Sequence, residues 1–139
     1  LTVTQFDYLV FPGGFGAARN LCTFAKTGAA MVVHPEVIRV LQQAHAMGKP
    51  IGAICIAPIL VAKVLGQHGV CVTLGGTSDL DSVLTGWGAT PAACNSGACV
   101  TDKINKVVTT PAYMYDDATL AEVFGGIRHM AAALREMGV

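Results

Sequence analysis

Net charge is the first thing this sequence lacks. Only 13% of its residues are charged, and nine Lys and Arg balance nine Asp and Glu. Without a surplus of basic residues, nothing draws the chain electrostatically to nucleic acid or to an anionic membrane surface. We therefore expect neither partner.

The sequence also lacks a membrane-spanning run and a leader peptide. Although 53% of the residues are hydrophobic, the uncharged stretch Ile51–Ala62 is too short, and too interrupted by Pro and Gly, to cross a bilayer. The opening residues, Leu1 to Thr4, contain no basic n-region and no initiator Met. We expect an intracellular protein whose amino end extends further, with residues 1–139 forming one domain.

Metal-binding and disulfide frameworks are absent as well. The five cysteines form no C-x-x-C pair, and neither they nor the four histidines show zinc-ligand spacing, so we expect no metal and no organic cofactor. An odd number of cysteines in an apolar chain indicates a reducing compartment. We interpret four of them as core or loop residues, namely Cys22, Cys71, Cys94 and Cys99.

A strand–turn–helix around Cys55 is the feature on which the rest depends. The apolar run Pro50–Ile54 is typical of a strand buried on both faces, and Pro58 suits the first turn of a helix. Cys55 lies at the change from one to the other, where open α/β sheets place their ligands. The positive end of the following helix favours a thiolate there, and the small residues Ala53 and Ala57 leave room for a sharp turn. This pattern predicts a reactive thiol in place of an inert buried cysteine.

A glycine-rich loop, Pro12 to Gly16, follows the expected strand Phe6–Phe11. If that strand runs parallel to the cysteine strand, both open on one edge, and the N–H of Gly13 or Gly14 could join that of Ile56 in an oxyanion hole. Dinucleotide binding is an alternative interpretation, because Gly14-x-Gly16 precedes a helix. The third glycine position holds Arg19, however, and the spaced acid, Glu36, begins a helix and does not end a strand. A glycine turn with no ligand is a further interpretation.

The remaining elements alternate, which predicts a doubly wound α/β fold with a mostly parallel sheet and helices on both faces. We expect a β-hairpin formed by 99–101 and 107–110, and a strand over Val70–Leu74. The segment 87–97 reads as a loop. The expected helices cover 15–26, 35–47, 58–65 and 79–84, the last of these capped by Thr77 or Ser78. A final helix begins after Asp116 or Asp117 as cap. Its apolar face carries Leu120, Val123, Phe124, Ile127, Met130, Ala131 and Leu134.

Three stretches, taken together and in this order, resemble one protein family. They are Phe11-Pro12-Gly13-Gly14-Phe15-Gly16-Ala17-Ala18-Arg19-Asn20-Leu21, then Gly48-Lys49-Pro50-Ile51-Gly52 through Cys55-Ile56-Ala57-Pro58, and Asn105-Lys106-Val107-Val108-Thr109-Thr110-Pro111-Ala112-Tyr113-Met114. The sequence resembles the ElbB branch (enhancing lycopene biosynthesis protein 2 and its mitochondrial relatives) of the PfpI and class I glutamine amidotransferase-like superfamily, over nearly all of its length.

The resemblance implies a flavodoxin-like sandwich with Cys55 as the reactive elbow cysteine and Gly13 and Gly14 as donors of oxyanion N–H groups. The histidine of the superfamily's peptidases would fall near Leu74 or Gly75, and neither is a histidine. Members of the branch begin earlier, with a strand, a loop bearing a glutamate that partners the thiol, and a helix. This sequence lacks them, so we expect a longer polypeptide or another segment to fill that place. The resemblance also implies a homodimer or higher oligomer, mitochondrial in a eukaryote and cytoplasmic in a bacterium.

Two functions follow as hypotheses. The resemblance implies a glutathione-independent glyoxalase that uses Cys55 on small 2-oxoaldehydes, with an acidic residue from outside this sequence moving the proton. The alternative is a non-catalytic redox-sensing or assembly protein, because none of the four histidines is placed to complete a triad with the thiol.

Overall fold

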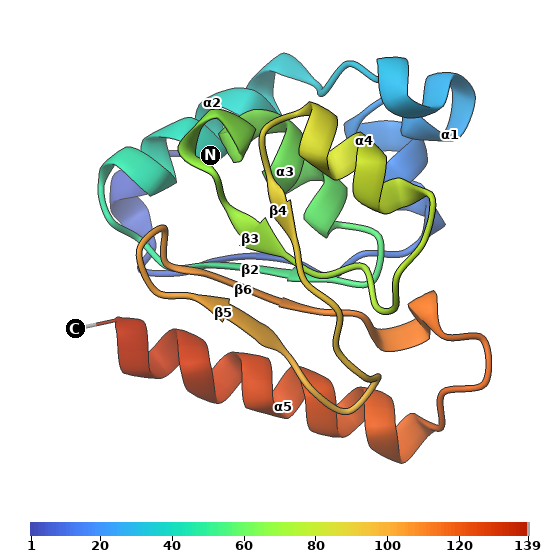
Figure 1. The fold of residues 1–139 in the computed structure, drawn as a ribbon. Helices are drawn as coiled ribbons and strands as arrows, with labels where there is room; N and C mark the ends of the chain where they lie inside the picture. Colours follow the sequence, from blue (N-terminus) through green and yellow to red (C-terminus); the bar gives the residue numbers. More distant parts are fainter. Residues whose placement is uncertain (139) are drawn as a thin grey trace.

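The computed structural model describes residues 1–138 and arranges them in layers around a four-stranded sheet (Figure 1). Its strand order is β1-β2-β6-β5, where β1, β2 and β6 run parallel and β5 pairs antiparallel with β6. This confirms the α/β fold with a mostly parallel sheet and one hairpin. The strands are β1 Leu9–Phe11, β2 Ile51–Ile54, β5 Val100–Asp102 and β6 Val107–Thr110.

Helices cover both faces of this sheet. In Figure 1, α2, α3 and α4 lie above it and α5 runs along its lower face. All residues of β2 and β6 are buried, as expected for strands covered on both sides. The α-helices are α1 Phe24–Thr27, α2 Pro35–Ala46, α3 Pro58–Leu65, α4 Leu80–Gly86 and α5 Leu120–Met137; shorter turns are the 3-10 helices Val3–Gln5, Gly28–Ala30, Gly66–His68 and Ala112–Met114 and the π-helix Ala17–Leu21.

The strand expected over Val70–Leu74 is the first correction. It is shortened to β3, Cys71–Val72, and pairs in a separate parallel sheet with β4, Thr90–Pro91, which lies in the segment expected to be a loop. The reason is that side chains of the main sheet accept the N–H groups of this segment. Asp102 Oδ2 accepts from Cys71 at 2.8 Å and Thr109 Oγ1 accepts from Thr73 at 3.0 Å. The segment therefore lies beside β6 without a backbone ladder.

Two helix predictions are also corrected. The helix expected over 15–26 is interrupted at Cys22, whose extended backbone (φ −157°) forms an antiparallel bridge with Val33. The last helix is capped by Thr119, which accepts the N–H of Glu122 at 3.1 Å, and not by Asp116 or Asp117. By contrast, α2 begins at Pro35 as predicted and ends one residue before the predicted Met47.

The outer edge of β1 is one of the two edges of the described sheet, and β5 forms the other. Val10 there is 43% exposed, and an apolar pocket of about 200 Å³, lined in part by Leu9, Phe11, Val37 and Val40, lies on the α2 side of the strand. The expectation that a further segment fills the gap in this sheet stays a prediction, and this edge is where such a strand would pair.

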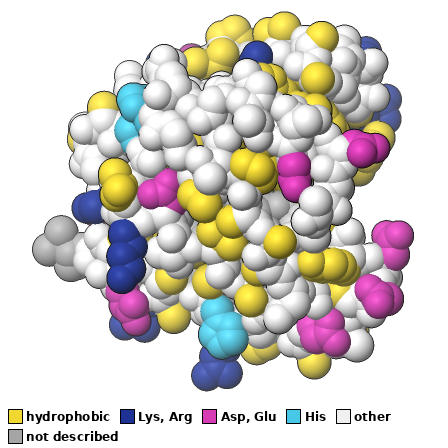
Figure 2. Space-filling model, viewed as in Figure 1, with side chains coloured by type: hydrophobic (Ala, Val, Ile, Leu, Met, Phe, Trp, Pro, Cys, Tyr) yellow, Lys and Arg dark blue, Asp and Glu magenta, His cyan; other side chains and the backbone are white. Residues whose placement is uncertain are grey.

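Charge is spread thinly over the surface. On the face drawn in Figure 2, acidic and basic side chains are dispersed between apolar and uncharged ones, so this face presents no continuous basic patch. Among residues 1–138, no helix combines the length and the apolar character needed to cross a bilayer.

Candidate active site

Cys55 occupies a strained turn at the carboxyl end of β2. Its φ is +61°, in the left-handed region, where a residue with a Cβ is less stable by about 1–2 kcal/mol. Its N–H donates to Thr110 O at 2.9 Å, which ties the turn to β6, and the N–H of Ala57 donates to Ile54 O at 3.0 Å. The half-buried thiol is free. The sequence prediction of a sharp strand-to-helix turn at Cys55 therefore agrees with the backbone geometry.

The glycine loop lies directly against this turn. Strand β1 pairs with β2 in the register Phe11↔Ala53, which brings Gly13 opposite Cys55. A Cβ at Gly13 would come within 2.4 Å of Ile54 O and 3.1 Å of Cys55 Cβ, so only glycine fits. Its φ of +90° is also one that other residues rarely adopt. Gly14, with φ +82°, borders open space.

Donors for an anion are present beside the thiol. The N–H groups of Cys55 and Ala57 are bonded, whereas the N–H of Ile56 between them has no backbone acceptor within residues 1–138. The same holds, in the described chain, for the N–H of Gly13 and of Gly14. Such N–H groups at the edge of a parallel sheet can bind an oxyanion that forms next to the sulfur. Their role as donors stays a prediction.

The ends of β6 and β3 complete this edge. Ala112, just after β6, has φ +46°, and Gly75, after β3, has φ +103°. Tyr115 lies against Gly75, 3.2 Å from the position of a Cβ, and donates its hydroxyl to Cys94 O at 2.6 Å. Leu74 is buried. At the two positions where the sequence resemblance would place a histidine, the structure therefore has a buried leucine and a glycine packed against tyrosine.

The four histidines make contacts with residues other than Cys55. His34 caps α2 by accepting the N–H of Glu36. His45 and His68 stack on each other, with ring centroids 4.4 Å apart, and His45 also bonds Asn105. His129 on α5 contacts Gly97 O at 3.1 Å. The structure thus assigns each imidazole a structural partner.

The other four cysteines differ in burial. Cys22 is buried, and its thiol contacts Ala17 O and Ala18 O, which agrees with the interpretation of Cys22 as a core residue. Burial raises the pKa of the half-buried Cys71, Cys94 and Cys99 thiols, and the carboxylate of Asp102 raises that of Cys71 further. Among residues 1–138, no group of three or more His, Cys, Asp or Glu side chains is placed to hold a metal ion.

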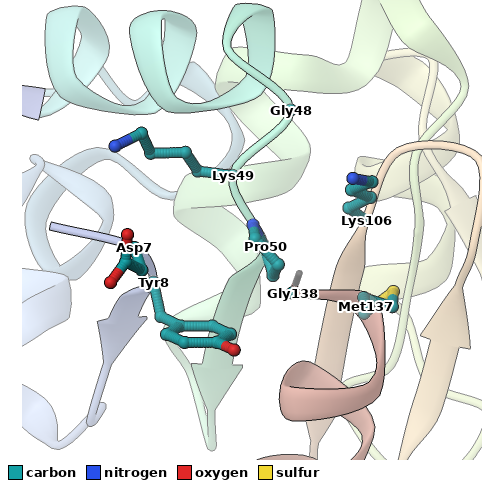
Figure 3. Close-up of a pocket in the computed structure, with 8 residues that line it drawn as sticks. All are labelled: Asp7, Tyr8, Gly48, Lys49, Pro50, Lys106, Met137 and Gly138. Atoms are coloured by element: carbon teal, nitrogen blue, oxygen red, sulfur yellow. The ribbon is translucent and has the colours of Figure 1, made fainter. Parts of the chain in front are cut away.

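A pocket of about 320 Å³ opens at the opposite edge of the sheet (Figure 3). Tyr8, Pro50 and Lys106 line it, each just before the amino end of a strand. The Lys49 amine donates to Phe6 O and lies over the Phe6 ring, so this cation already has partners. The pocket is separate from the elbow, which belongs to the carboxyl edge.

Comparisons with known proteins agree with this geometry. No family model matches the chain. It is 44% identical to the human "Glutamine amidotransferase-like class 1 domain-containing protein 3, mitochondrial" over 99% of its own length and 53% of that protein. It is 42% identical to the rat "ES1 protein homolog, mitochondrial", over 99% of the chain and 54% of that protein. Over nearly all of its own length, the chain is therefore similar to the ES1 proteins of the class I glutamine amidotransferase-like family.

A solved structure supports the same assignment. The isoprenoid biosynthesis protein with amidotransferase-like domain from Ehrlichia chaffeensis superimposes with a TM-score of 0.86 at 30% identity, over 99% of this chain and 62% of that one. The chain spans about half the length of the curated relatives it matches. The activity of the whole protein is therefore a separate question from its family and fold.

Sequence reasoning missed two residues at this edge of the family fold, Ala112 and Tyr115. A signal for Ala112 was present, because Pro111-Ala112 ends an apolar strand and begins a helical turn, as the segment around Cys55 does. Nothing in the sequence indicated that the Tyr115 hydroxyl would bond the loop carrying Cys94.

Proposed function

We propose that the full-length protein is a glutathione-independent glyoxalase acting on small 2-oxoaldehydes, with Cys55 as nucleophile. One observation carries the proposal: the left-handed turn of Cys55 is packed against Gly13 so closely that only a hydrogen fits between loop and elbow. A strained, half-buried thiol beside several backbone N–H groups without backbone acceptors suits addition to a carbonyl carbon. The mitochondrial names of the relatives support a mitochondrial location in a eukaryotic source.

In the proposed reaction, the Cys55 sulfur adds to the aldehyde carbon and the carbonyl oxygen becomes an alkoxide. The N–H groups of Ile56 and of Gly13 or Gly14 stabilise this charge until protonation gives a hemithioacetal. An acidic residue from the rest of the protein then moves the proton on this carbon to the neighbouring carbonyl carbon, and the hydroxyl proton of the hemithioacetal passes to the neighbouring carbonyl oxygen. The product is a thioester of the 2-hydroxy acid. Water cleaves the thioester and releases the acid and the free thiol, so glyoxal plus water becomes glycolate.

The test uses the full-length protein with glyoxal and follows glycolate formation by NMR. Cys55→Ser should lower turnover by roughly 10³-fold or more, as loss of a nucleophile does in other covalent catalysts. Cys71→Ser is the matched control, because this half-buried thiol lies in β3, away from the elbow, and its loss should leave the rate unchanged. Turnover retained in the Cys55 variant would rule out the mechanism.

A second candidate is a redox sensor in which Cys55 is oxidised reversibly to sulfenic acid, with hydrogen peroxide as oxidant and water as the other product. The observation in its favour is that the resemblance places the superfamily's catalytic histidine near Leu74 or Gly75, and neither residue is a histidine. Stoichiometric oxidation of Cys55 by dilute peroxide in a protein that produces no glycolate would favour the sensor. Turnover with slow oxidation would favour the enzyme.

A further inference from the structure

A tight turn lies between Cys94 and Cys99, two cysteines to which the proposed function assigns no role. The N–H of Ala98 donates to Asn95 O at 3.2 Å, and the N–H of Gly97 donates to Asn95 Oδ1 at 3.0 Å. A turn closed in this way holds its first and fourth Cα atoms within about 7 Å. Cys94 and Cys99 are the residues immediately before and after it, so the chain reversal brings the two thiol-bearing residues back toward each other.

Contacts with α5 hold this turn in one place. The Ser96 hydroxyl donates to Glu122 Oε2 at 2.5 Å, and His129 contacts Gly97 O. At Gly126 the approach is so close that a Cβ would come within 2.8 Å of Ser96 O and 2.6 Å of Thr110 Oγ1. These contacts hold residues 96 and 97 of the turn against α5.

Both thiols are half-buried and free, and only the four residues of the turn separate them along the chain. The Cys94 thiol lies 3.7 Å from Thr73 Oγ1. Burial raises the pKa of both groups, and the negative charge of Cys99 raises the pKa of Cys94 further. We take Cys99 as the thiolate that meets the oxidant and Cys94 as the thiol beside it; the disulfide product is the same if the two exchange roles.

We propose that Cys94 and Cys99 are a redox-active dithiol that closes to an intramolecular disulfide when a hydroperoxide oxidises the protein. The Cys99 thiolate attacks the peroxide, takes one oxygen to become a sulfenic acid, and releases the alcohol or water. The Cys94 sulfur then attacks the Cys99 sulfur and expels water. In sum, two thiols and one hydroperoxide give one disulfide, one alcohol or water, and one further water.

This dithiol is connected to the elbow on two sides. The Tyr115 hydroxyl bonds Cys94 O, and its ring lies against Gly75 at the carboxyl edge. On the other side, Thr110 Oγ1 donates to Ala98 O at 2.7 Å, while Thr110 O accepts the N–H of Cys55. A disulfide between residues 94 and 99 would constrain the segment from which both connections start. The inference does not depend on whether Cys55 turns over a substrate.

The experiment treats the reduced full-length protein with hydrogen peroxide at low protein concentration, blocks remaining thiols with iodoacetamide, and digests with trypsin and chymotrypsin. Cleavage after Trp87 and Lys103 releases peptide 88–103, which contains Cys94 and Cys99 and no other cysteine. The expected product is this peptide with both alkylations lost and with the mass of two hydrogen atoms missing. Reduction before alkylation should restore both carbamidomethyl groups.

Three variants provide the controls. Cys94→Ser and Cys99→Ser should each abolish the disulfide peptide. Cys71→Ser is matched to them, because burial raises the pKa of that half-buried thiol too, and it should leave the disulfide unchanged. The proposal is overturned if peptide 88–103 stays doubly alkylated at peroxide doses that oxidise Cys55, or if a cross-link between Cys55 and Cys99 forms in its place.

Discussion

Gly13→Ala is the substitution that tests the contact between the glycine loop and the elbow most directly. Its new Cβ would lie 2.4 Å from Ile54 O and 3.1 Å from Cys55 Cβ. Non-bonded heavy atoms pack best about 3.5 Å or more apart, so loop and elbow must separate by about 1 Å. A shift of this size moves the N–H of residue 13 away from the sulfur, and an error of about 1 Å in a catalytic constellation can cost about 10²-fold in rate.

The magnitude follows from comparing this substitution with Gly14→Ala. Both glycines have left-handed φ angles, +90° and +82°, so each substitution carries a backbone cost of about 1–2 kcal/mol. At Gly14 nothing lies within 4 Å of the new Cβ, and no further cost arises. At Gly13, crowding adds about 1–3 kcal/mol. We expect destabilisation by about 2–5 kcal/mol for Gly13→Ala and about 1–2 kcal/mol for Gly14→Ala.

The assay is urea unfolding with linear extrapolation, together with the rate of alkylation of Cys55 by iodoacetamide. Equal denaturant slopes for both variants would show that the difference lies in stability and not in the compactness of the unfolded state. If Gly13→Ala costs no more than Gly14→Ala, or leaves the alkylation rate of Cys55 unchanged, the close packing of loop and elbow is not what holds the site.

Three further predictions concern strain, capping and pH. Cys55→Gly should be more stable than Cys55→Ala by about 1 kcal/mol in chemical unfolding. Glycine relieves the left-handed strain, but its greater conformational entropy in the unfolded state offsets part of that gain. Thr119→Ala should lower stability by about 1 kcal/mol, whereas Asp117→Ala, at a position once expected to be the cap, should be nearly neutral in the same assay. For Asp102, burial alone would raise the pKa, but hydrogen bonds from Asn105 and from Cys71 N–H outweigh it and lower the pKa. Because the folded pKa lies below the unfolded one, this carboxylate stabilises the protein above about pH 4, and the contribution is lost as the pH falls through the folded pKa; Asp102→Asn should flatten the acid limb of a stability–pH curve.

The elbow could be predicted from sequence because local signals there agree. An apolar run, small residues beside the cysteine and a proline in the next turn each favour one backbone path, and tertiary packing adds to that preference without opposing it. The same holds for α2, where Pro35 and the apolar stripe define the helix. Parallel pairing of β1 with β2 followed from the order of strands and helices, and it brings Gly13 to Cys55.

Elements that depend on distant side chains could not be predicted. Nothing local in Cys71–Val72 shows that Asp102 and Thr109 would accept its N–H groups and separate it from the main sheet. Thr, Asp and Asn are all residues that cap helices well, so the local sequence does not choose Thr119 over Asp116 or Asp117. The clamped turn between the two cysteines likewise depends on Gly126 and Glu122 of α5.

Left-handed residues gather at one edge of this fold. Gly13, Cys55, Ala112 and Gly75 follow β1, β2, β6 and β3, and all have positive φ. Strand β3 runs in the same direction as β6. The N–H of Cys71 donates to Asp102, the residue paired with Val107. Two residues later in both strands, the N–H of Thr73 donates to Thr109, so the four positions share the carboxyl edge. In a left-handed turn glycine is the stable choice, and the chain uses it at Gly13 and Gly75. A cysteine at φ +61° gives up about 1–2 kcal/mol relative to that choice. Ala112 carries a similar cost at φ +46°, so a left-handed turn does not by itself mark a functional residue. At Cys55 the cost coincides with a thiol beside N–H groups that have no backbone acceptor within residues 1–138, and this coincidence supports the proposed site.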